Sequence, residues 1–294
     1  MSRRLTRKNG LLVATGAVVA AGLALGTPLA ASAATTAHTG ADVAAASAPR
    51  LKGDTSSSRP TVVLVHGAWA DSSSWYGVMD RLRKAGYPVV AEANPLEGLA
   101  HDSAALAARL RTIDGPVILV GHSYGGAVIS EAAAGNPNVK ALVYVAAFAP
   151  DAGESVGSLL TVPVAHPIAA TPLVTYPVDN PDGTTDTATL IDPAQFRDVF
   201  AGDLKPTLAE DMAESQRPTS LEAVTEMATA AAWHTIPSWY LVAKQDHAIA
   251  PDLERYMAAR LGAHTVESDG SHSVMVSHAD TVTRLIESAD RGTR

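Results

Sequence analysis

The chain has 294 residues, no cysteine and a formal net charge of −8 at pH 7. This length fits one large α/β domain or two small ones. The absence of cysteine excludes disulfides and thiol catalysis, and the negative charge argues against nucleic acid or an anionic membrane surface as a partner.

Residues 1–33 have the three parts of a secretory signal peptide. Four basic residues stand near the start, Leu11 to Leu25 is apolar, and Ala31-Ser32-Ala33 offers the small residues of a cleavage site. Because the apolar stretch is short and rich in Ala and Gly, we favour a cleaved signal over a membrane anchor. We therefore expect a secreted protein with no stable membrane association after cleavage. The Arg3-Arg4 pair leaves the Sec and twin-arginine export routes both open.

Residues 34–60 are dominated by Ala, Ser and Thr and have no apolar period, which predicts a disordered leader. In the remaining residues, 61–294, strand-like apolar runs alternate with amphipathic helix-like segments. The predicted strands are residues 61–65, 88–93, 116–120, 141–148, 238–243 and 264–267, and the predicted helices are 71–87, 103–113, the segment after Tyr124, 251–261 and 277–289. This alternation predicts an α/β fold, with a mostly parallel sheet of about six strands and helices on both faces. Nothing in the sequence indicates an oligomeric state.

The sequence Gly121-His122-Ser123-Tyr124-Gly125 matches G-x-S-x-G and lies between a predicted buried strand and a predicted helix. Such a turn presents its serine in a strained backbone conformation that small neighbours permit, so Ser123 is the candidate nucleophile. Because the turn opens a helix, we expect the backbone N–H of Tyr124 to point toward an oxyanion formed beside Ser123. The backbone N–H of Ala68, in the loop after the first strand, is the second expected oxyanion-hole donor. We expect the His66 side chain only to brace that loop.

Residues from about 151 to 235 break the alternation and predict an inserted helical cap. They combine Pro-rich irregular segments with short helices that begin near Asp192-Pro193, Lys205-Pro206 and Thr219-Ser220. Large apolar residues of the cap are candidates to roof a substrate pocket: Phe196, Val199, Phe200, Met212, Met227 and Trp233. Trp233, which lies where the cap returns to the sheet, and Trp69 are the leading pocket candidates. The alternative is that the cap residues pack on one another and on the sheet.

A serine hydroxyl needs a base that accepts its proton and an acid that holds the base in the right tautomer. His272 follows the last predicted strand, and Asp246 follows the strand before it. Ser123, Asp246 and His272 occur in a chain order in which Ser-His-Asp triads are found. Asp151, after an earlier strand, is the alternative acid. No histidine pair has a metal-ligand spacing and there is no Gly-rich phosphate loop, so we expect neither a metal nor a cofactor.

Together these motifs resemble the α/β-hydrolase superfamily, and more narrowly its branch of plant methyl esterases and hydroxynitrile lyases. The motifs are H-G-A-W at 66–69, G-H-S-Y-G-G at 121–126, Asp246-His247-Ala248-Ile249-Ala250-Pro251 and the Ser271-His272 loop. The resemblance covers residues 61 to about 287. It implies a cofactor-free serine esterase with Ser123, Asp246 and His272 as triad, and with Ala68 and Tyr124 as oxyanion-hole donors.

The expected activity is that of a secreted carboxylic-ester hydrolase for small to medium, uncharged esters, with an acyl-enzyme on Ser123. A ligand-binding protein with little turnover and a non-ester chemistry of the same branch are the alternatives. Dehalogenases and epoxide hydrolases resemble this chain but carry Asp where Ser123 stands, which disfavours them. In the lyases a lysine follows the catalytic histidine and a threonine occupies the position of Gly67. Here Ser273 follows the histidine, so we expect no cyanohydrin cleavage.

Overall fold

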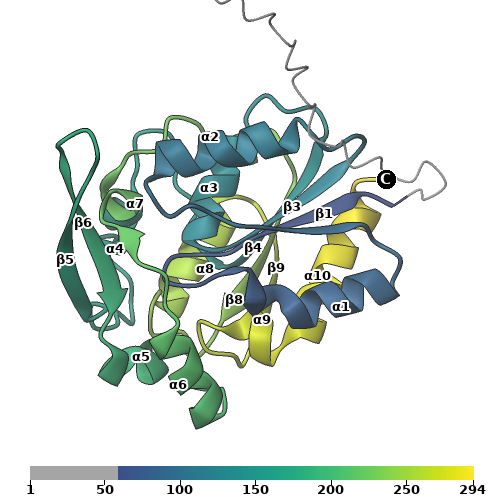
Figure 1. Ribbon diagram of the computed structural model, residues 1–294. Coiled ribbons are helices and arrows are strands. Elements are labelled where there is room, and N and C mark those ends of the chain that lie inside the picture. The colour runs from purple at the N-terminus through teal and green to yellow at the C-terminus, as the bar shows by residue number, and fades with distance from the viewer. Residues whose placement is uncertain (1–58) are drawn as a thin grey trace, which may run out of the picture. The chain divides into compact units, whose positions relative to one another are not determined.

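The computed structural model describes residues 59–294; the predicted signal peptide (1–33) and nearly all of the predicted leader (34–60) lie outside the described residues. The main sheet is parallel and has six strands in the order β2-β1-β3-β4-β8-β9 (Figure 1). The strands are β1 Thr61–Val65, β2 Val89–Glu92, β3 Val117–Ser123, β4 Val139–Ala147, β8 Ser238–Ala243 and β9 His264–Ser268. The predicted fold class is confirmed.

Helices cover both faces of this sheet because its central strands are apolar on both sides. Every residue of β1 and of β3 is buried, as is typical of parallel strands. One face carries a short 3₁₀ turn (Ser72–Trp75), α1 (Tyr76–Lys84), α9 (Val274–Ser277) and α10 (Ala279–Gly292), and the other carries α2 (Leu99–Leu110), α3 (Tyr124–Ala132) and α8 (Pro251–Arg260) (Figure 1). Each face has its own apolar core. Since all six strands are parallel, the loops after β1, β3, β8 and β9 leave from the same edge of the sheet.

The segment between β4 and β8 contains an antiparallel sheet that the sequence analysis did not predict. Its strands are β5 (Leu173–Asp179), β6 (Thr185–Ile191) and β7 (Thr219–Ser220), in that order. The Pro-rich stretch was interpreted as irregular, but Pro177 lies in β5 at the edge of this sheet, where a missing N–H is tolerated. The turn that joins β5 to β6 contains Gly183 at a φ of 85°, a conformation that glycine adopts readily.

Four short helices complete this segment: α4 (Val156–Leu160), α5 (Pro193–Phe200), α6 (Pro206–Glu214) and α7 (Glu222–Thr225). The helices α5 and α6 each begin with a proline, which suits the first turn because its N–H would have no helical partner there. A 3₁₀ turn at Ala232–His234 then leads back to β8. The cap is therefore mixed in structure, with a β-hairpin as well as the predicted helices.

Candidate active site

Ser123 ends β3 and immediately precedes α3, in a backbone conformation that few residues adopt. Its φ is 52° and its ψ is −126°, a strained combination for a residue with a Cβ atom. The turn is tight: a Cβ on Gly121 would lie 2.5 Å from the carbonyl oxygen of Gly125, and a Cβ on Gly125 would lie 2.7 Å from that of Val65. Only glycine fits at these two positions, so the G-x-S-x-G pattern follows from the sharp strand-to-helix turn.

The loop after β1 packs directly against Ser123. A Cβ on Gly67 would lie 2.7 Å from the Cβ of Ser123, so glycine at this position lets the backbone near Ala68 approach the serine. Ala68 and Tyr124 line one cavity together with Ser123, and Tyr124 opens α3, where backbone N–H groups lack helical partners. The Tyr124 hydroxyl donates a hydrogen bond of 2.9 Å to the buried carboxyl group of Asp102, which anchors the ring. The structure thus brings both expected oxyanion-hole residues to the candidate nucleophile.

His66 braces this loop through both of its ring nitrogens. Its Nε2 accepts the backbone N–H of Asn94 at 3.0 Å, which leaves Nδ1 to donate to the carbonyl oxygen of Gly67 at 3.0 Å. Burial lowers the pKa of His66 to about 4, and the Arg217 guanidinium acts in the same direction. Arg217 also donates to the carbonyl oxygens of Asn94 and Pro95, at 2.8 and 3.3 Å. At pH 7 His66 is therefore an uncharged structural residue.

Asp246 and His272 form a buried, hydrogen-bonded pair in the loops that follow β8 and β9. Their exposed fractions are 1% and 0%. The Nδ1–H of His272 donates to Oδ2 of Asp246 at 2.5 Å, while Oδ1 of Asp246 accepts the backbone N–H groups of Ala248 and Ile249 at 2.7 and 2.8 Å. This leaves Nε2 of His272 without a hydrogen-bond partner within residues 59–294. An imidazole in this tautomer can accept a proton at Nε2.

Other side chains fix the position of His272. The Nε2–H of His122, the residue before the serine, donates to the carbonyl oxygen of His272 at 2.9 Å. Burial, followed by the neighbouring His272, lowers the pKa of His122 well below its usual range, so the anchor stays uncharged. The Phe200 ring meets the imidazole of His272 edge to face, with ring centroids 4.7 Å apart. The alternative acid, Asp151, instead accepts a hydrogen bond of 2.9 Å from His234 and is partly exposed.

A cavity of about 340 Å³ lies beside Ser123. The cap supplies much of its wall, including Val156, Leu160, Val162, Val164, Ile168 and Leu173. None of the residues that line it carries a formal charge. The volume suits a small organic molecule. An ionised group would lose its hydration there without gaining a charged partner, so the cavity disfavours charged ligands.

The two tryptophans predicted for the pocket lie in different places. Trp69 lines the cavity, and its indole N–H donates to the Thr189 hydroxyl at 3.1 Å, which ties the loop after β1 to β6. Trp233 is not among the lining residues; it packs in the apolar core with its indole N–H donating to the carbonyl oxygen of Pro150 at 2.9 Å. The other apolar cap residues named as roof candidates, Phe196, Val199, Phe200, Met212 and Met227, do not line it either. Residues from α4 to the start of β5, together with Ala223 and Val224 of α7, form the cap's part of the wall instead.

A sequence model of the α/β hydrolase family matches residues 62–285 of this chain. The chain belongs to the α/β-hydrolase family.

Individual relatives of this hydrolase agree with that assignment. The α/β hydrolase nvfD of Aspergillus novofumigatus is 27% identical over 252 residues, which are 79% of this chain and 96% of that protein. A carbendazim hydrolyzing esterase of Nocardioides sp. is 38% identical over 111 residues, 33% of this chain and 46% of that protein. The crystal structure of polyneuridine aldehyde esterase superposes with a TM-score of 0.66 at 21% identity, over 78% of this chain and 98% of that one. The predicted resemblance to the α/β-hydrolase superfamily is confirmed, the polyneuridine aldehyde esterase shares this fold, and the protein is a hydrolase.

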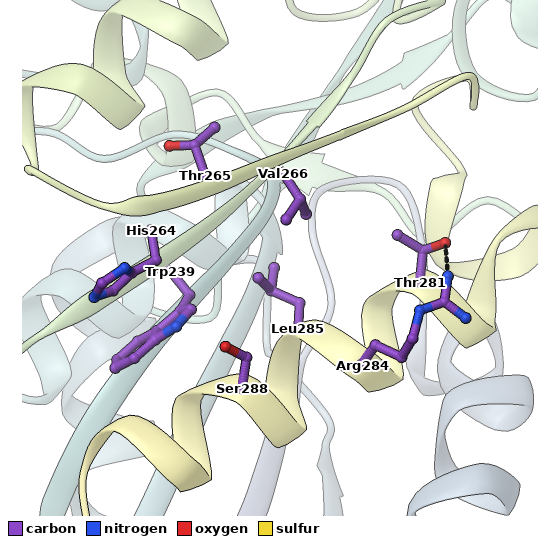
Figure 2. Close-up of a pocket in the computed structure, with 8 residues that line it drawn as sticks. All are labelled: Trp239, His264, Thr265, Val266, Thr281, Arg284, Leu285 and Ser288. Carbon is purple, nitrogen blue, oxygen red and sulfur yellow. Dashed lines mark hydrogen bonds between the residues drawn. The ribbon is translucent and has the colours of Figure 1, made fainter.

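A second cavity of this hydrolase, of about 260 Å³, lies between β9 and α10 (Figure 2). The rings of Trp239 and His264 stack there with centroids 5.0 Å apart, and Arg284 donates to the Thr281 hydroxyl at 2.9 Å (Figure 2). No residue predicted for catalysis lines this cavity. The candidate active site is therefore the cavity beside Ser123.

Two further observations concern only residues 59–294. No helix in this part of the chain is long and apolar enough to cross a bilayer. No group of three or more His, Asp or Glu side chains in it is placed to hold a metal ion.

Sequence reasoning missed several residues that support the site of this hydrolase. Asn94, Asp102 and Arg217 brace the loop after β1 and Tyr124 through long-range hydrogen bonds, for which the sequence carries no local signal. Glu254 did carry a signal. It lies on the buried stripe of α8 with Leu253, Met257 and Ala258, where an acidic residue is unusual.

Proposed function

We propose that this hydrolase cleaves small to medium, uncharged carboxylic esters through an acyl-enzyme on Ser123. The observation that carries the proposal is the buried Asp246–His272 pair, whose unpaired Nε2 belongs to a loop at the same sheet edge as the strained Ser123. The uncharged wall of the cavity supports uncharged substrates. The esterase names among the relatives support ester chemistry.

In the first half of the proposed reaction, the Ser123 hydroxyl oxygen attacks the ester carbonyl carbon and His272 Nε2 takes the hydroxyl proton. The backbone N–H groups of Ala68 and Tyr124 stabilise the negative charge on the former carbonyl oxygen. Asp246 keeps the proton of His272 on Nδ1 and stabilises the imidazolium. The C–O bond to the alcohol then breaks, and the imidazolium returns its proton to the departing alcohol.

In the second half, His272 Nε2 takes a proton from a water molecule, whose oxygen attacks the acyl carbon. The same two N–H groups hold the second tetrahedral oxyanion. Its collapse releases the carboxylic acid and returns the proton to Ser123. All the groups that this cycle requires belong to the chain itself, so the proposal includes no cofactor.

The substitution Ser123→Ala tests this proposal. We expect kcat for short p-nitrophenyl esters to fall by roughly 10⁴- to 10⁶-fold with little change in Tm, because the nucleophile is lost and no packing is disturbed. A fluorophosphonate probe should label the unmodified protein and not the variant. Ser130→Ala is the matched control, since Ser130 is a buried serine on α3 whose hydroxyl bonds Tyr144 instead. Labelling that persists in Ser123→Ala, or an unmodified protein that binds esters without turnover, would contradict the proposal.

The N-terminal sequence supports a second, independent proposal, that the protein is secreted. Its evidence is the signal-like residues 1–33. The expected partner outside the cell is a small-molecule ester.

A further inference from the structure

Glu254 is a fully buried acid that the proposed reaction does not use. It lies on α8, and its exposed fraction is 0%. Its Oε2 accepts the backbone N–H of Ala243, the last residue of β8, at 3.1 Å. The Asp246 side chain lies within hydrogen-bonding reach of its carboxyl group. Glu254 therefore touches both the end of the strand and the acid that follows it.

A proton is needed on one of these two carboxyl groups, because two carboxylates cannot donate to each other. Asp246 already accepts three hydrogen bonds, two from backbone N–H groups and one from His272. The second oxygen of Glu254, Oε1, receives no donor within residues 59–294. A fully buried carboxyl group with one oxygen that receives no donor is the group that carries the proton. The geometry thus assigns the charge to Asp246 and the proton to Glu254.

The groups that surround Glu254 agree with an uncharged side chain. Tyr240 on β8 and Asp246 in the following loop are its titratable neighbours. Arg255, the next residue on α8, is partly exposed and binds Asp252 and Glu267. Burial, followed by the charge of Asp246, raises the pKa of Glu254 well above its usual range.

We propose that Glu254 is a positioning residue, whose uncharged carboxyl group holds Asp246 against the end of β8 and so orients His272. This inference rests on the proposed function, in which Asp246 orients the base. A carboxamide can replace the carboxyl group of Glu254, because its carbonyl oxygen accepts from the backbone N–H of Ala243 and its NH₂ group donates to Asp246. An apolar side chain of similar size cannot.

The experiment compares Glu254→Gln with Glu254→Met. We expect Glu254→Gln to keep kcat within about threefold of the unmodified protein, and Glu254→Met to lower kcat by roughly 10- to 100-fold with KM nearly unchanged, because a small displacement of the acid misorients the base. The control is Met257→Ala, which opens a cavity on the same buried stripe of α8 at a residue whose sulfur accepts the backbone N–H of Ala149. It should lower Tm and leave kcat nearly unchanged.

The pH profile of kcat/KM separates positioning from charge. Because the Glu254 side chain is uncharged, Glu254→Gln removes no charge. The acidic limb of the kcat/KM profile should therefore be the same for this variant and for the unmodified protein. Had Glu254 been ionised, its removal would shift that limb downward by roughly one pH unit. A shifted limb, a Glu254→Gln variant as slow as Glu254→Met, or a Glu254→Met variant with full kcat would each overturn the inference.

A spectroscopic measurement keeps this test separate from the proposed function. The proton between His272 Nδ1 and Asp246 should give a low-field NMR signal that persists in Glu254→Gln and is lost or broadened in Glu254→Met. An infrared difference spectrum at pH 7 should show the protonated-carboxyl band of Glu254 disappearing in Glu254→Gln. Both signals are expected whether or not esters are turned over, and their absence would contradict the inference alone.

Discussion

Acid should destabilise this protein through His66. The side chain is fully buried, and burial lowers its pKa from the ordinary 6.5 to about 4. A lowered pKa means that the unfolded chain binds a proton before the folded chain does. The contribution of His66 to the free energy of unfolding is therefore fully present above pH 6.5. It is lost as the pH falls from 6.5 toward 4.

The size of this effect follows from the two pKa values. Relative to pH 7, the His66 contribution to the free energy of unfolding falls by about 2 kcal/mol at pH 5 and by about 3 kcal/mol at pH 4. His66→Gln removes this proton linkage. It also disturbs the bonds to Asn94 and Gly67, which should cost roughly 1 to 2 kcal/mol at pH 7. The stability curves of the two proteins should therefore approach each other, or cross, near pH 5.

Urea unfolding followed by tryptophan fluorescence at pH 7, 6 and 5 measures these curves. His101→Gln is the control for the loss of a histidine as such, because the His101 side chain is more than half exposed. The difference in the free energy of unfolding between His66→Gln and the unmodified protein should shrink by about 2 kcal/mol from pH 7 to pH 5. A difference that stays the same at both pH values, within about 0.5 kcal/mol, would refute the role given to His66.

Three further predictions concern the acid, the reaction and the mature N-terminus. Asp246→Asn should lower kcat for short esters by about 10⁴-fold, because His272 loses the tautomer that accepts a proton. Asp151→Asn should lower kcat less than about tenfold, because the partner of Asp151 is His234. The opposite ranking would move the acid to Asp151. No cyanide should be released from mandelonitrile above the uncatalysed background, because Ser273 follows His272 and Gly67 leaves no room for a larger side chain beside Ser123. Steady release that depends on Ser123, without ester turnover, would replace the esterase proposal. N-terminal sequencing of secreted material should find Ala34 as the first residue, while a full-length, membrane-retained product would favour an anchor.

The elements that could be predicted from the sequence are those whose causes lie within a few residues. The apolar runs of β1 and β3 predict buried strands, and the glycines around Ser123 indicate a turn that no larger residue permits. The edge strand β5 was missed because Pro177 is a breaker in isolation and becomes acceptable only at the edge of a sheet. Local patterns thus predicted the parallel sheet and the strained serine, and failed where a strand depends on its partner.

Only the tertiary structure decided which side chains meet. Asp246 and Asp151 both follow strands of the sheet, but the order of β4, β8 and β9 brings Asp246 to His272 and leaves Asp151 with His234. Trp233 is as apolar as a pocket residue should be, yet its indole N–H finds a buried carbonyl oxygen away from the cavity. The proton on Glu254 likewise depends on an acceptor eight positions earlier in the chain and on complete exclusion from water. The charge state of a side chain and its contacts depend on the residues that surround it in the fold. Those residues come from segments that are far apart in the sequence.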